Sequence, residues 1–114
     1  MGMVEIHKSG GSDPVLKVVF GVPTFTTNSS YSTAEIYFDD AVKGKTIRAA
    51  SVAYRITSTS STGTIWYDPS ANKWYRRQKE GEVTPSTYYP AEARLHLTVS
   101  NIAECLSYSV TYEE

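Results

Sequence analysis

The feature that most constrains this chain is a two-residue alternation of apolar and polar side chains. Every second residue from Ala34 to Phe38, within residues 32–38, is apolar. The same period recurs over residues 47–57 and 91–100. Because successive residues of an extended strand point to opposite faces of a sheet, this period is typical of half-buried strands rather than of helices.

The composition also favours strands. Valine and isoleucine outnumber the four leucines, and nine tyrosines and two tryptophans occur in 114 residues. β-branched and aromatic side chains fit the pleated surface of a sheet. We count about seven strand candidates joined by short connections, which predicts an all-β fold. The expected architecture is one antiparallel β-sandwich of about seven strands, immunoglobulin-like or jelly-roll in topology, with a small β-barrel as the alternative.

The alternation changes phase or fails at three places. In residues 47–57, the longest strand candidate, Ile47 is out of phase with the residues that follow. We therefore expect a β-bulge between Arg48 and Ala50. Residues 79–90 and 101–106 do not alternate and are predicted to be connections between strands.

The chain is expected to consist of a flexible lead-in, residues 1–14, and a single domain over residues 15–114. The lead-in contains the linker-like run Ser-Gly-Gly-Ser at residues 9–12. Within it, Val4 and Ile6 alternate in a way that allows a short edge strand.

The strongest local signal predicts a β-hairpin between residues 64 and 78. Two aromatic-rich runs flank a segment that begins with Asp68-Pro69 and ends at Asn72, residues that favour a turn. This arrangement pairs Tyr67 with Trp74 and Trp66 with Tyr75. Each face of the hairpin then carries one aromatic pair.

We expect Ile65 to turn its own face, with Tyr67 and Trp74, toward the core. Trp66 and Tyr75 then face outward, and Lys73 and Arg77 lie on the same face. Aromatic rings beside cations can stack on a sugar ring, a base or a partner's side chains. We therefore take these four outward residues as the candidate binding site, which Tyr88 or Tyr89 could extend. The alternative is that another sheet or protomer covers them and that they only stabilise the hairpin. The four outward residues are Trp66, Tyr75, Arg77 and Lys73.

No catalytic residue is assigned. His96 shares the expected outer face of its strand with Glu92 and Arg94, but Ser100 is four residues away, about 13 Å along a strand. That distance is too long for a base and its nucleophile. A solvated polar face is the expected role of this stretch.

No metal site or cofactor is expected either. Asp39 and Asp40 precede a lysine-rich segment and indicate a turn rather than a calcium site. Cys105 is the only cysteine, which excludes an intramolecular disulfide and a multi-cysteine zinc site. It lies in an apolar stretch and is expected to be a small buried residue.

The charge balance argues against nucleic acid as a partner. Eleven basic residues stand against twelve acidic ones, and Arg76 and Arg77 point to opposite faces of one strand. No apolar run approaches the roughly 20 residues that span a membrane, so no membrane partner is expected. The N-terminal residues do not form a secretory signal, and a lone thiol suits the cytoplasm of the producing cell or a virion better than secretion.

One phrase of the sequence resembles a known family. Residues 50–56 followed by residues 62–66 are similar to the SVxYRI…TGTxI strand–loop–strand phrase of small immunoglobulin-like or fibronectin-like β-sandwich proteins of tailed phages and prophages. The likeness covers under a third of the chain and departs from the pattern over residues 66–77, which are longer and more aromatic. It implies a structural or accessory module associated with a virion.

Together these observations lead us to expect a non-enzymatic structural or protein-interaction module. It would belong to a larger assembly, such as a phage or prophage virion or a surface appendage, and associate with itself or with a protein partner. The alternative is a carbohydrate-binding module that uses the outward aromatics of the hairpin.

Overall fold

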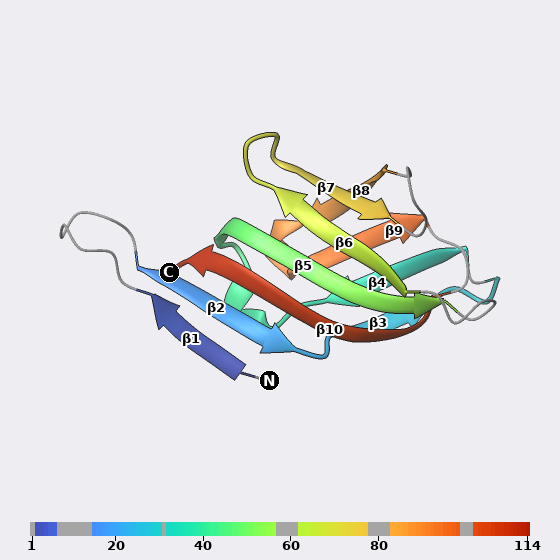
Figure 1. Ribbon diagram of the computed structural model, residues 1–114, viewed down its shortest axis with the longest axis horizontal. Coiled ribbons are helices and arrows are strands. Elements are labelled where there is room, and N and C mark those ends of the chain that lie inside the picture. The colour runs from blue at the N-terminus through green and yellow to red at the C-terminus, as the bar shows by residue number, and fades with distance from the viewer. Residues whose placement is uncertain (1, 7–14, 31, 57–61, 78–82, 99–101) are drawn as a thin grey trace.

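The computed structural model describes residues 2–6, 15–30, 32–56, 62–77, 83–98 and 102–114. These residues form ten strands, paired antiparallel in a single sheet with the order β1-β2-β10-β5-β6-β7-β8-β9-β4-β3 (Figure 1). The strands are β1 (Gly2–Ile6), β2 (Leu16–Gly21), β3 (Thr24–Thr27), β4 (Thr33–Tyr37), β5 (Thr46–Ile56), β6 (Thr62–Asp68), β7 (Lys73–Arg77), β8 (Thr84–Tyr89), β9 (Arg94–Thr98) and β10 (Ile102–Glu113). Within the described ranges the only helical segments are two three-residue 3-10 turns, Asp40–Val42 and Pro90–Glu92.

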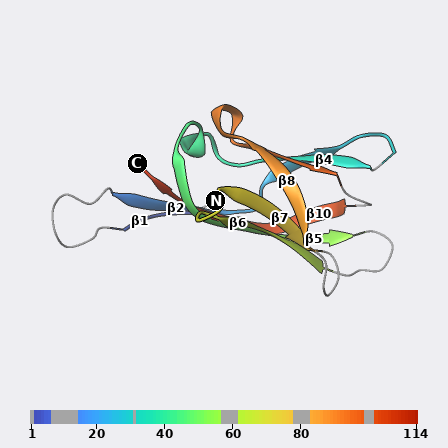
Figure 2. The same ribbon diagram turned by 90° about the horizontal axis from the view of Figure 1, so that it is seen from above.

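The all-β prediction is confirmed, but the seven-strand sandwich is wrong. The two layers expected of a sandwich come from one sheet that curls over like half of a barrel (Figure 2). The curl is at β8: residues 84–86 pair with β7, and residues 87–89 pair with β9. The sheet is not a closed barrel either, because the order of hydrogen-bonded strands begins at β1 and ends at β3, and these two strands are not paired with each other.

The core lies between the two layers and is built by the alternation. On the first layer, Tyr54, Ile65 and Val110 turn inward and are fully buried. On the second, Ile36 and Leu95 do the same. The period of two therefore places one apolar row of each strand in the core.

Both segments that were predicted to be connections contain strand. Residues 84–89 form β8, whose half-buried and exposed residues alternate although they are mostly polar, so hydropathy gave no signal. Residues 102–106 begin β10, in which the register with β5 shifts between Ile102 and Glu104 and again between Cys105 and Ser107. These irregularities break the period on which the prediction relied.

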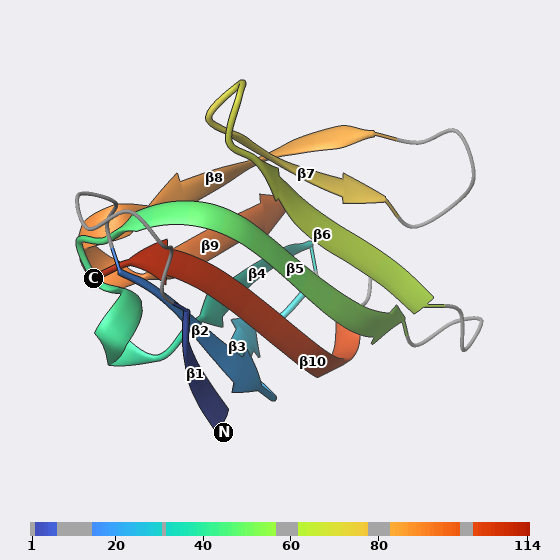
Figure 3. The ribbon, with the colours of Figure 1, turned by 60° about the vertical axis from the view of Figure 1, so that its left-hand side comes forward.

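Two finer expectations are confirmed. Thr111 of β10 pairs with Ala49 and the next residue pairs with Ile47, so Arg48 is the extra residue of a bulge. The short edge strand expected at Val4 is present as β1 (Figure 3), which shortens the expected lead-in because residues 2–6 belong to the sheet. Residues 7–14 of that lead-in lie outside the described residues.

Candidate functional site

The outer face of the hairpin carries the four residues that the sequence singled out. The register pairs Trp66 with Tyr75, as predicted, and their ring centroids are 5.7 Å apart at a tilt of 34°. The guanidinium carbon of Arg77 lies 5.3 Å from the centroid of the Trp66 ring. Trp66 and Tyr75 are half-buried, whereas Arg77 and Lys73 are exposed. Three of the four residues therefore form one cluster, and Lys73 lies next to the turn, where it pairs in register with Asp68.

This outer cluster continues a row that crosses the first layer. Trp66 pairs with Ser51, Ser51 with Ser109, and Ser109 with Phe20. On the other side, Tyr75 pairs with Pro85. Partners in register share a face of the sheet, so the outer face has rings at its two ends and small hydroxyl side chains between them.

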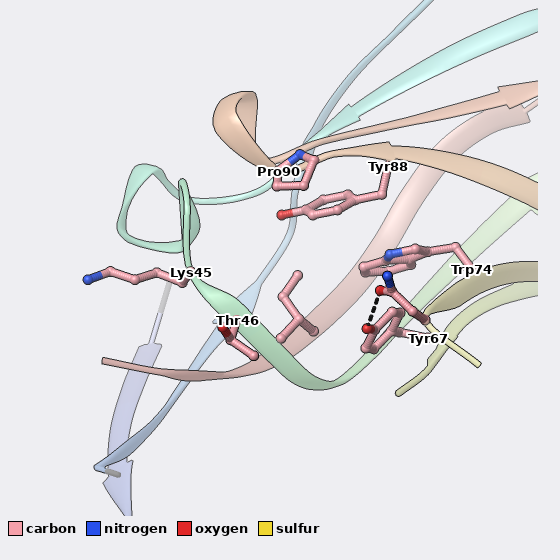
Figure 4. A pocket seen from close by; sticks show the side chains of 8 residues that line it. Lys45, Thr46, Tyr67, Trp74, Tyr88 and Pro90 are labelled. Carbon is pink, nitrogen blue, oxygen red and sulfur yellow. Dashed lines mark hydrogen bonds between the residues drawn. The ribbon is translucent and has the colours of Figure 1, made fainter. Parts of the chain in front are cut away.

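The inner face of the same hairpin contributes to a pocket at one end of the half-barrel (Figure 4). Tyr67, Trp74 and Tyr88 lie one above another, with centroids 5.1 Å apart for the first pair and 4.9 Å apart for the second. The hydroxyl of Tyr67 donates a hydrogen bond of 2.7 Å to Oδ1 of Asn72. With Ile47, these residues line a volume of about 200 Å³.

A second pocket of about 280 Å³ adjoins the first, because Asn72, Trp74, Tyr88 and Pro90 line both. We call the two together the end cleft. Lys45 and Thr46 lie on the first pocket, and Lys73, Ser86 and Thr87 on the second. Sequence reasoning missed this cleft because its walls come from β5, the hairpin and β8. These segments are separated along the chain and meet only in the folded protein. The one available signal was the Asn72 turn, which the structure confirms with a φ of 52°.

Two hydroxyls on the walls of the end cleft are buried without a hydrogen-bond partner in the described part of the chain. They are Oγ of Ser86 and the phenol oxygen of Tyr88. Burial raises the pKa of Tyr88 from its ordinary 10.0 to about 12, because the charged phenolate is disfavoured away from water.

A polar cluster occupies the outer face of the second layer. Arg94 donates to both Glu35 and Glu92, and Nδ1 of His96 lies 2.5 Å from Oε2 of Glu35. The guanidinium carbon of Arg94 is 4.1 Å from the centroid of the Tyr89 ring. The expected polar face around His96 is therefore present. The sequence missed Glu35 because it comes from β4, the neighbouring strand.

The remaining candidates follow their expected roles. Oδ1 of Asp39 accepts from the backbone N–H of Ala41 and caps the turn that follows, and Asp40 pairs with Lys43 at 3.1 Å. Cys105 is buried, and burial raises the pKa of its thiol to about 12. Ser100 lies outside the described residues. Across the described ranges we find no cluster of three or more metal-ligating side chains and no helix long and apolar enough to span a membrane.

The open edge of the sheet carries exposed apolar residues. Met3 and Val4 are neighbours on β1, and their exposed fractions are 47% and 50%. Since neighbours on a strand point to opposite faces, neither face of β1 is covered at these positions. Phe20 and Val22 on or beside the adjacent strand β2 are also exposed.

Comparison with known proteins gives no match: no family model, no curated protein and no solved structure is similar to this chain.

Proposed function

We propose that this protein is a non-enzymatic interaction module that joins copies of itself through the free edge of β1. The assembly would be of the kind that the phage resemblance implies, a virion or a surface appendage. The observation that supports this proposal most directly is the exposure of Met3 and Val4 on opposite faces of an edge strand.

An edge strand presents unpaired backbone N–H and C=O groups to any other strand that can reach it. Protected edges usually carry charged side chains or proline; β1 has one charged residue, Glu5, beside the exposed Met3 and Val4. Covering apolar surface stabilises an assembly by about 25 cal/mol for each Å² removed from water. Strand pairing at β1 would therefore gain both hydrogen bonds and apolar burial.

A second copy is the occupant that best suits this edge. Antiparallel pairing of β1 with the same strand of another molecule satisfies both free edges at once, in a two-fold symmetric contact. The formal net charge of the chain is −1, so repulsion between copies is small.

Light scattering coupled to size-exclusion chromatography of the full chain tests this proposal. We expect a multimer whose β1 amides are protected from hydrogen exchange, and a monomer for Val4→Lys, because a lysine at that position charges the edge. Val83→Lys is the matched control, since Val83 has the same exposed fraction of 50% but lies outside the edge strand. A wild-type chain that stays monomeric at every concentration, with rapidly exchanging β1 amides, contradicts the proposal.

Carbohydrate binding is a second proposal, favoured by the outward, tilted pair of Trp66 and Tyr75 with Arg77 over the Trp66 ring. A glycan array should then give hits that Trp66→Ala removes and that Tyr37→Ala, at an exposed tyrosine of β4 in the other layer, leaves intact. An array without hits would remove this alternative. The non-enzymatic part of the first proposal would fail if the protein showed a turnover that His96→Ala abolishes.

A further inference from the structure

We propose that the end cleft binds a small aromatic carboxylate, with its ring among the apolar walls and its charge at the mouth of the first pocket, where Lys45 lies. The ammonium of Lys45 points away from the pocket in Figure 4, so this long, flexible side chain has to turn inward to meet the charge. This site does not depend on pairing at β1, because the cleft is built by β5, the hairpin and β8. Neither the outer aromatic cluster nor the free edge contributes to it.

The apolar walls suit a flat ring held by its surroundings rather than a stacked sugar. Tyr67 and Tyr88 flank the Trp74 ring from below and above in Figure 4, and Trp74 is only 4% exposed. A sugar needs an open aromatic face, and the faces of Trp74 are taken. The cleft instead meets the edges of these rings and the side chain of Ile47. Ring edges are electropositive, and they attract the face of another ring or an oxygen anion.

The polar groups of the cleft favour an anion. No aspartate or glutamate lines either pocket. Lys45 and Lys73 have no carboxylate within salt-bridge distance among the described residues, whereas Lys43, two residues before Lys45, pairs with Asp40. Oδ1 of Asn72 already accepts from Tyr67, which leaves the amide nitrogen of Asn72 as a donor.

The size of the first pocket limits the ligand to a small molecule. Its volume of about 200 Å³ is below the roughly 300–1,000 Å³ of pockets for drug-sized ligands, so it suits a single ring.

The test uses the full chain and benzoate as the probe, with benzyl alcohol as the neutral probe and glucose as the sugar probe. The chain has two tryptophans, and Trp66→Phe identifies the indole N–H signal of Trp74 in an amide-correlation NMR spectrum. We expect benzoate to shift the Trp74 indole and Asn72 side-chain signals in a saturable way, and benzyl alcohol and glucose to bind more weakly.

Charge recognition is tested with Lys45→Gln, and Lys43→Gln is its matched control on the same loop. Loss of one exposed cation should weaken benzoate binding about fivefold, without a change for benzyl alcohol, and the control should bind as the wild type does. The proposal is overturned if benzoate moves neither signal, if benzyl alcohol binds as well as benzoate, if glucose binds best, or if both lysine variants behave alike. The variant Val4→Lys should bind benzoate as the wild type does. A failure of the cleft proposal is therefore distinguishable from a failure of the proposed pairing at β1.

Discussion

The two faces of the β6–β7 hairpin carry similar aromatic pairs in different surroundings. On the inner face, the ring centroids of Tyr67 and Trp74 are 5.1 Å apart, and Trp74 also stacks on Phe38, which follows β4, and on Tyr88 of β8. On the outer face, the ring centroids of Trp66 and Tyr75 are 5.7 Å apart, and the further ring interaction found in the described residues is that of Trp66 with Arg77 of the same hairpin.

The difference shows that strand register forms both aromatic pairs and that the second layer of the sheet covers only one of them. Both pairs follow from the alternation of two facing strands. Only the inner pair is covered when the sheet curls at β8 and brings Tyr88 over Trp74. We therefore expect the inner pair to support the fold and the outer pair to remain free for recognition.

The largest expected effect contrasts the two tryptophans. Trp74→Ala should lower the free energy of unfolding by about 3–5 kcal/mol, because it leaves a cavity in the core. Trp66→Ala should cost about 1–2 kcal/mol, because that ring is half-buried and loses mainly its pairing with Tyr75. Urea unfolding followed by circular dichroism measures both values. Equal losses would mean that the two faces do not differ as described.

The next contrast concerns two glycines that lie under aromatic rings. A Cβ on Gly63 would come within 2.2 Å of the Tyr54 ring, which is fully buried and cannot move aside. Gly63→Ala should therefore cost about 1–3 kcal/mol by overpacking. A Cβ on Gly2 would meet the Phe20 ring, but that ring is 43% exposed and can swing into solvent. Gly2→Ala should thus change stability by less than about 0.5 kcal/mol in the same denaturation assay, and a reversed order would contradict this account.

A smaller effect separates two hydroxyls on the inner face. Tyr67→Phe removes a hydrogen bond to Asn72 and should cost about 0.5–1.5 kcal/mol. Tyr88→Phe removes a buried hydroxyl that has no partner in the described residues, so it should leave thermal stability unchanged or raise it. If Tyr88→Phe proves the more harmful variant, the hydroxyl of Tyr88 has a partner of its own.

The last contrast is a dependence of stability on pH, which is absent at neutral pH and develops only in alkali. The pKa of Tyr88 is about 12 in the folded chain and 10.0 when it is unperturbed, so the unfolded state loses this proton first. The corresponding stability is complete below about pH 10 and is lost as the pH rises toward about 12. Denaturation at a series of alkaline pH values should show this decline, and Tyr88→Phe should make it shallower. Cys105 contributes a decline of the same sign, beginning near its ordinary pKa of 9.0. An unchanged slope in Tyr88→Phe would contradict the burial of the phenol.

Sequence reasoning predicted strands well where the alternation was regular. It identified the hairpin with its register and the bulge at Arg48. It missed β8, because Thr84, Ser86 and Thr87 are polar on both sides of the strand. It also missed the first residues of β10, where two register shifts disturb the period.

The candidate sites also differ in how far the sequence predicted them. Trp66, Tyr75 and Arg77 come together because one hairpin holds all three, so local spacing was enough to predict their contact. The end cleft and the pairing of Glu35 with His96 join residues from separate strands. No spacing along the chain could reveal those contacts.

The amino-acid sequence by itself determined that this chain forms strands, where one hairpin turns, and which side chains share a face, because these properties depend on neighbours along the chain. Only the tertiary structure decided that ten strands make one curled sheet, which aromatic pair is covered, and where a cleft opens. Those outcomes depend on how distant strands pack, and β8, the strand at which the sheet folds over, has the weakest hydrophobic pattern of the strands discussed here.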